Sequence, residues 1–196
     1  MKNEVISSYK KSSIDYFGNS NSLHELGVKA KKLEDAASNQ VLEVLNLKNK
    51  EVIYTSGTAE NYTMILKTIK SDKNIVTNNK ELYEIGKDMN INIKYGDVKE
   101  LIDKNTQLVS VTDDIELPEY SGLLHINMTT SNNNLNKYNF ITLEEIPAFG
   151  CLIKDKNIVL KPLVNGGKST TPYRSGTSAT NLIVSFSKLI KLKYKK

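Results

Sequence analysis

The first half of the chain alternates between helical and strand-like patterns of hydrophobic residues. Apolar side chains recur at steps of three and four between residues 24 and 47, which predicts a long amphipathic helix. Short apolar runs predict strands at residues 52–54, 74–77, 91–95 and 107–111, with helices predicted after the first strand, at residues 80–89 and at residues 98–102. This alternation favours an α/β fold with a mainly parallel sheet flanked by helices.

The second half of the chain is less regular. Strands are predicted at residues 123–127, 140–143, 151–154 and 158–160, and a final helix begins near residue 178. Two polar stretches predict loops, an asparagine run at residues 132–134 and a Gly/Ser/Thr segment at residues 165–177. We see neither an internal repeat nor a domain linker, so we expect a single domain that spans residues 1–196.

The charge of the chain raises the possibility of nucleic-acid binding without supporting it. The formal net charge is +5 and the isoelectric point is near 9.0, but Arg174 is the only arginine. Base readout favours arginine, and the dense lysine run at the end of the chain is typical of a solvated helix end. Nucleic acid is therefore not the expected partner, although a lysine-rich binding module remains an alternative.

Three further features narrow the class of protein. No run approaches the roughly 20 apolar residues that span a bilayer, and the first residues lack the apolar run of a signal peptide. We therefore expect a cytoplasmic protein without a membrane partner. The single cysteine, Cys151, excludes an internal disulfide and a multi-cysteine metal cluster, and its apolar neighbours predict a buried structural thiol. No metal is expected.

Three segments carry a family resemblance because they occur together and in order. Residues 18–27 read G-N-S-N-S-L-H-E-L-G, similar to G-N-P-S-S-x-H-x-x-G, with Ser20 in the place of the proline. Residues 54–61 read Y-T-S-G-T-A-E-N, similar to F-T-S-G-A-T-E-x. Residues 160–177 resemble L-x-P-x-x-x-G-G followed by R-S-G-T. The chain thus resembles the cysteine desulfurases of the class-V aminotransferase group, which have the aspartate-aminotransferase fold.

The resemblance implies a shortened large domain of a fold-type-I pyridoxal-phosphate enzyme, with the small C-terminal domain absent. Chemistry on this cofactor needs a lysine amine and a carboxylate for the pyridinium nitrogen. Aligning residues 142–145 with the family's S-x-H-K places Glu144 at the histidine and Glu145 at the lysine. Three further cofactor contacts of the family, the pyridinium aspartate, the ring-stacking histidine and a glutamine, fall on Asn127, Leu82 and Thr130.

These positions predict a catalytically inactive pseudoenzyme that binds no cofactor covalently. A vestigial anion site is expected at Ser56, Gly57 and Thr58, where a helix N-terminus offers backbone N–H groups. The family's R-S-G-T loop reaches across a dimer interface, so the resemblance implies a homodimer with interface candidates Arg174, Ser175, Gly176 and Thr177. We expect the two histidines, His24 and His125, to be structural. The other expected role for the scaffold is to bind or regulate a protein partner that the sequence does not identify.

An enzyme with altered chemistry is the remaining alternative. Glu144 and Glu145 could act as acid and base groups with Asp113 or Asp114. Adjacent side chains on a strand point to opposite faces, which disfavours joint action by the two glutamates.

Overall fold

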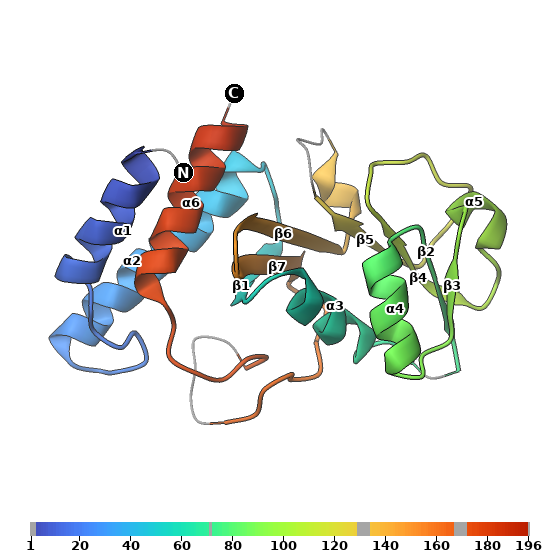
Figure 1. The fold of residues 1–196 in the computed structure, drawn as a ribbon, viewed down its shortest axis with the longest axis horizontal. Helices are drawn as coiled ribbons and strands as arrows, with labels where there is room; N and C mark the ends of the chain where they lie inside the picture. Colours follow the sequence, from blue (N-terminus) through green and yellow to red (C-terminus); the bar gives the residue numbers. More distant parts are fainter. Residues whose placement is uncertain (1–2, 71, 129–133, 167–171, 196) are drawn as a thin grey trace.

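A seven-stranded sheet forms the centre of the molecule (Figure 1). The computed structural model describes residues 3–70, 72–128, 134–166 and 172–195. The strand order is β1-β7-β6-β5-β4-β2-β3. The strands are β1 (Lys50–Thr55), β2 (Asn74–Thr77), β3 (Ile93–Tyr95), β4 (Thr106–Val111), β5 (Leu123–Asn127), β6 (Phe140–Ile146) and β7 (Phe149–Asp155). Strands β3, β2, β4, β5 and β6 pair in parallel, whereas β7 pairs antiparallel with both β6 and β1.

Helices cover both faces of this sheet and confirm the predicted α/β architecture. The helices are α1 (Asn3–Asp15), α2 (Glu25–Val44), α3 (Thr58–Leu66), α4 (Lys80–Asp88), α5 (Val98–Leu101) and α6 (Thr180–Tyr194). One core joins α2, α5 and α6 to the sheet, and a second core joins α3 and α4 to the opposite face. Helix α1 packs against α6, so α1, α2 and α6 lie together at one end of the molecule (Figure 1).

The connection between β4 and β5 is unusually short for a parallel crossover. Residues 112–122 make it without a helix, although the two strands are paired neighbours. A parallel pair is normally joined by a dozen or more residues that include a helix.

Among the described helices, none is both long and apolar enough to cross a membrane.

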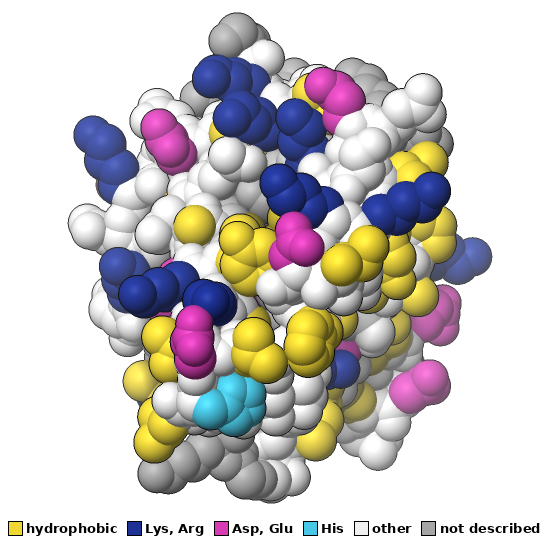
Figure 2. Space-filling view, turned by 90° about the vertical axis from the view of Figure 1, so that its left-hand side faces the viewer, with side chains coloured by type: hydrophobic (Ala, Val, Ile, Leu, Met, Phe, Trp, Pro, Cys, Tyr) yellow, Lys and Arg dark blue, Asp and Glu magenta, His cyan; other side chains and the backbone are white. Residues whose placement is uncertain are grey.

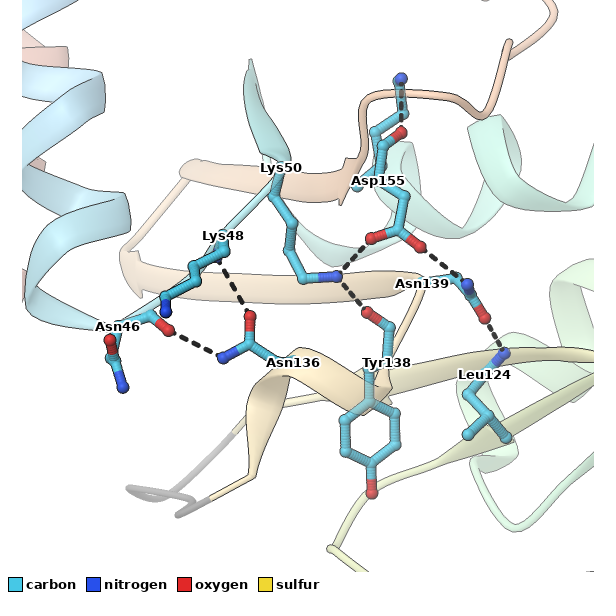
Figure 3. Close-up of polar contacts among 9 residues, drawn as sticks. Asn46, Lys48, Lys50, Leu124, Asn136, Tyr138, Asn139 and Asp155 are labelled. Atoms are coloured by element: carbon cyan, nitrogen blue, oxygen red, sulfur yellow. Dashed lines mark hydrogen bonds and ion pairs between the residues drawn. The ribbon is translucent and has the colours of Figure 1, made fainter.

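A buried lysine ties the edge strand β1 to the middle of the sheet (Figure 3). Lys50 is 2% exposed, and its Nζ donates to the carbonyl of Tyr138 and to Oδ1 of Asp155, each at 2.5 Å. The other oxygen of Asp155 accepts from Asn139, whose amide oxygen in turn accepts the N–H of Leu124. A buried ammonium group must be paired and hydrogen-bonded to be tolerated, and this network satisfies that requirement.

Two local expectations were incomplete or wrong. Helix α1 was not anticipated, because its sequence is rich in serine and only Val5 and Ser12 are buried in it. Residues 158–160 do not form a strand. The N–H of Ile158 bonds to Asp155 in a turn and its carbonyl accepts from Lys154, while Leu160 is buried among the side chains of the α3 face. Core packing, rather than strand pairing, explains the apolar character of this segment.

Candidate functional site at the N-terminus of helix α3

The turn from β1 into α3 presents the start of a helix at the edge of the sheet. Gly57 occupies the N-cap position with φ 136°, a backbone conformation that side chains with a Cβ rarely adopt. A Cβ at this position would also lie 2.5 Å from Oε2 of Glu144. Inside the turn, Thr55 donates to Asn61, and Asn61 donates to the carbonyl of Cys151. The turn is therefore anchored to β7 and shaped for close approach by another group.

Carboxylates of the chain itself occupy the positions around this helix start. Oε2 of Glu144 accepts the backbone N–H of Thr58 at 2.8 Å. Glu60 accepts both the N–H and the hydroxyl of Ser56 at 2.7 Å. Glu81, from the first turn of α4, accepts the hydroxyl of Thr58 at 3.2 Å. The positive end of the helix dipole stabilises such negative charge.

All three members of the expected anion site are thus bonded within the chain. The N–H groups of Ser56 and Thr58 bind Glu60 and Glu144, and the N–H of Gly57 is 3.4 Å from the hydroxyl of Thr55. An external anion would have to displace at least one carboxylate and would meet the charge of the others. The negative charge of these carboxylates would repel a bound anion.

Glu145 points away from this cluster. Its carboxylate accepts from Nζ of Lys193 at 2.7 Å and from the hydroxyl of Tyr194 at 2.6 Å, at the end of α6. Burial and the bond to Glu145 raise the pKa of Tyr194 to about 12. Side chains alternate between the two faces of a strand, so Glu144 lies with α3 and Glu145 with α6. The expectation that the two glutamates point apart is confirmed.

Asn127 and Leu82 lie on the α3 side of the sheet without forming a polar recess together. Leu82 is fully buried in the core beneath α3 and α4, and its N–H bonds to the capping side chain of Asn79. Asn127 ends β5 and is half-buried, and the nearby hydroxyl of Tyr62 accepts from Asn79. Burial raises the pKa of Tyr62, so this phenol stays neutral. Thr130 lies outside the described residues.

Both histidines have structural surroundings. His24 caps α2, and its Nδ1 accepts the N–H of Gly27 at 3.2 Å. His125 is fully buried, with Nδ1 2.8 Å from the hydroxyl of Ser110 and Nε2 3.0 Å from that of Thr142. Burial lowers the pKa of His125 to about 3, so the ring is neutral near pH 7.

The other acidic and basic candidates do not converge on the α3 turn. Asp114 pairs with Lys137 and accepts a hydrogen bond from Tyr138. Burial acts to raise the pKa of Asp114, but these two partners outweigh it and hold the pKa below its usual value. Asp113 accepts from Thr112. Lys154 is paired with Phe140 at the start of β6, whereas Glu144 lies near the end of that strand. Four residues of strand span about 13 Å, so the backbone of Lys154 lies well away from Glu144.

The interface candidates begin with an arginine that is engaged inside the chain. Nε of Arg174 donates to Oε1 of Glu60 at 2.6 Å. The backbone of Arg174 forms an isolated parallel β-bridge with Val164. Gly176 has φ 131° and so requires a glycine. Ser175 donates its N–H to the carbonyl of Val164, and Thr177 follows in an irregular segment before α6. Through Glu60, this loop is linked to the α3 turn.

Two residues of the cluster were missed from the sequence. Glu60 stands at the third position of α3, where an acidic side chain commonly reaches back to the helix start, so a capping pattern could have indicated it. No local signal could have placed Glu81 beside Thr58, because that contact joins two helices. Among the described residues, no group of three or more His, Cys, Asp or Glu side chains is arranged to hold a metal ion.

Comparisons with known proteins agree on one family. The model of the family described as aminotransferase class-V matches residues 1–114. The chain is 25% identical over 241 aligned residues to a NifS/IcsS protein homolog from Lactobacillus delbrueckii subsp. bulgaricus, covering 98% of this chain and 63% of that protein. It therefore spans less than two thirds of that relative's length.

Solved structures show the same fold. A NifS-like protein superposes with a TM-score of 0.85 at 20% identity, covering 98% of this chain and 66% of that one. A NifS-like protein from Rickettsia africae superposes with a TM-score of 0.84, also at 20% identity, covering 99% of this chain and 66% of that one.

Proposed function

The chain belongs to the class-V aminotransferase family, and from this premise we propose that it is a cysteine desulfurase-like pseudoenzyme, retained as a dimeric scaffold or protein-binding module. One observation carries the proposal: the carboxylate of Glu144 binds the N–H of Thr58 at the helix start that would otherwise receive a phosphate group. Glu81 adds a second negative charge at the same place, and Glu60, paired with Arg174, occupies the N–H of Ser56. These residues do not fit pyridoxal phosphate, because its phosphate would meet the carboxylates of Glu144 and Glu81 and would find the N–H groups of Ser56 and Thr58 already bonded.

The positions for the cofactor ring support the same proposal. Glu145 cannot form a Schiff base, and it is held by Lys193 and Tyr194 on the other face of the sheet. Asn127, a neutral amide, does not supply the carboxylate that keeps a pyridinium nitrogen protonated. Leu82 has no aromatic ring to stack and is buried in the core.

The direct test is reconstitution with the cofactor. The purified protein is incubated with pyridoxal phosphate, desalted, and examined for visible absorbance before and after borohydride reduction, with an active cysteine desulfurase as the positive control. We expect no retained absorbance and no covalent adduct by mass spectrometry. A stable, reducible aldimine would overturn the proposal of a pseudoenzyme.

Exposed apolar side chains at one end of the molecule support the scaffold role. Ile14, Phe17 and Leu23, in α1 and the loop after it, are 72%, 71% and 96% exposed. Figure 2 shows hydrophobic side chains lying among lysines on this side of the molecule, where α1, α2 and α6 lie together. Exposed apolar surface of this kind marks interaction sites on soluble proteins.

The scaffold role is tested by the size of the particle in solution. We expect light scattering of the wild type to give twice the mass of the chain. The double variant Phe17→Ser, Leu23→Ser should shift the balance toward monomer. Val159→Ser, which removes an equally exposed apolar side chain elsewhere, should not. A wild type that stays monomeric at all concentrations would refute the homodimer.

A further inference from the structure

A recess adjoins the α3 cluster, between α2, the edge strand β1 and the start of α6. It is a pocket of about 340 Å³, within the range of small-molecule sites. It touches Ser56 at one end but is not lined by Gly57, Thr58 or Glu144. Arg174 and Gly176 also line the pocket, so it adjoins the α3 turn, but the proposed function does not depend on it.

One wall of this pocket carries a buried carboxylate. Glu34, in the middle of α2, is only 4% exposed and lines the pocket. Its Oε1 accepts the hydroxyl of Thr180, the first residue of α6, at 2.7 Å. Within the described part of the chain no cation lies at ion-pair distance from Glu34. A buried carboxylate is normally paired with a cation, and one hydroxyl and a helix start compensate it only in part.

The cations around the pocket are largely engaged elsewhere. Lys31 pairs with Asp35, Lys50 with Asp155, and Arg174 with Glu60. Lys156 also lines the pocket, but it is exposed and lies beside the start of β1, where its N–H bonds to Asn49. Helix α2 runs antiparallel to β1, so Glu34 lies toward the opposite end of the pocket. The charge that Glu34 needs is thus not supplied by these neighbours.

Aromatic and apolar side chains line the pocket together with polar ones. Tyr54 stacks on Phe149 with ring centroids 5.8 Å apart, and Val52 and Ile183 complete this part of the wall. The hydroxyl of Tyr54 lies 3.2 Å from that of Ser38, one turn along α2 from Glu34. Burial raises the pKa of Tyr54, so the phenol remains a neutral hydrogen-bonding group. An aromatic face beside a carboxylate suits an organic cation with an alkyl body.

We propose that this pocket binds an alkylammonium or guanidinium group, with Glu34 as its counter-ion, Ser38 and Tyr54 as polar neighbours, and the aromatic wall around its carbon chain. The cation comes either from a small amine or from a lysine or arginine side chain of a peptide.

Binding of defined probes tests the proposal. Agmatine and 1-aminopentane are titrated into the protein by calorimetry, with 1-pentanol as the uncharged analogue. Acetylated peptide amides containing one lysine or one arginine form the second arm. We expect saturable binding of at least one cationic probe and none of pentanol. Binding of the peptides alone assigns the cation to a side chain, and binding of the free amines assigns it to a small molecule.

Two variants show whether Glu34 is responsible. Glu34→Gln keeps the shape and the bond to Thr180 but removes the charge, so it should weaken binding of the cation roughly tenfold or more. Glu43→Gln removes an exposed carboxylate of the same helix that does not line the pocket, and should leave binding unchanged. Equal binding by wild type and Glu34→Gln would overturn the assignment, as would a failure of every cationic probe to bind the wild type.

Two further readouts separate a binding role from a purely structural one. An unneutralised buried charge predicts that Glu34→Gln melts at the same temperature as the wild type or higher when no ligand is present. In amide spectra of the wild type, the cationic probe should shift the resonances of Glu34, Ser38 and Tyr54. A lower melting temperature for Glu34→Gln together with no probe-induced shifts would show that Glu34 serves only to hold Thr180 at the start of α6.

Discussion

Oε2 of Glu144 accepts the backbone N–H of Thr58 at 2.8 Å, which places the end of strand β6 directly over the start of helix α3. The bond joins residues 86 positions apart in the chain. It does for the helix what a capping side chain does, because it satisfies a terminal N–H and places negative charge at the positive end of the dipole.

Removing this carboxylate should weaken the fold by a small, measurable amount. We expect Glu144→Ala to lower the free energy of unfolding by about 0.5–1 kcal/mol, the range for loss of a helix cap at an exposed site. Glu84→Ala removes an exposed carboxylate from α4 and should change it by less than about 0.5 kcal/mol. Urea denaturation measures both, and equal values for the two variants would contradict a capping role for Glu144.

Stability should fall in mild acid because of His125. Its pKa is about 3 in the folded chain and 6.5 in the unfolded chain, so the unfolded state binds the extra proton between these values. Stability is therefore complete above about pH 6.5 and decreases toward pH 3, by about 1.4 kcal/mol per pH unit from this one group.

The variant His125→Gln isolates this contribution, because other groups titrate over the same range. Its stability relative to the wild type should improve steadily as the pH is lowered from 7 to 4, as measured by urea denaturation at each pH. A constant difference between the two proteins across that range would show that His125 does not titrate as its burial implies.

The lysine in the sheet should be essential to stability. Lys50→Met removes the ammonium group that bonds to Oδ1 of Asp155 and to the carbonyl of Tyr138 (Figure 3), and we expect the free energy of unfolding to fall by about 2–4 kcal/mol. Lys48→Met is the matched control, since Lys48 bonds to Asn136 through its backbone N–H, outside the network of Lys50. The double variant Lys50→Met, Asp155→Asn should recover part of the loss. Thermal or urea denaturation of Lys50→Met that matches the wild type would contradict this account.

A proline at position 20 should stabilise the chain. Ser20 is the second residue of a turn closed by a bond from the N–H of Ser22 to the carbonyl of Asn19, and its buried hydroxyl lacks a partner among the described residues. Proline is favoured at that position of a turn and removes the unpaired hydroxyl, so we expect a gain of about 1 kcal/mol in Ser20→Pro.

The neighbouring residue provides the control for this gain. Asn21→Pro removes an N–H that bonds to the side chain of Asn19 at 2.9 Å and places proline at an unfavourable position of the turn. It should lower the melting temperature. A Ser20→Pro variant that melts below the wild type would show that the backbone at residue 20 does not match the fixed φ of proline.

The sequence was most informative where a pattern is local. The alternation of apolar periods predicted the α/β class and most of the strands, and the ordered motifs around Gly18, Ser56 and Arg174 indicated the family that the comparisons found. Pyridoxal chemistry requires particular side chains, so the sequence alone was enough to motivate the proposal made for Glu145.

Only the tertiary structure decided how the remaining charges are arranged. No local pattern predicts that Glu144 lies over the start of α3, or that Glu34 of α2 meets Thr180 at the start of α6, 146 residues away. A strand or helix fixes the face on which a side chain lies, but what that face meets depends on how the elements pack. The identity of residue 145 follows from the chain, whereas the partners of Glu144 and Glu34 exist only once the sheet and its helices have assembled.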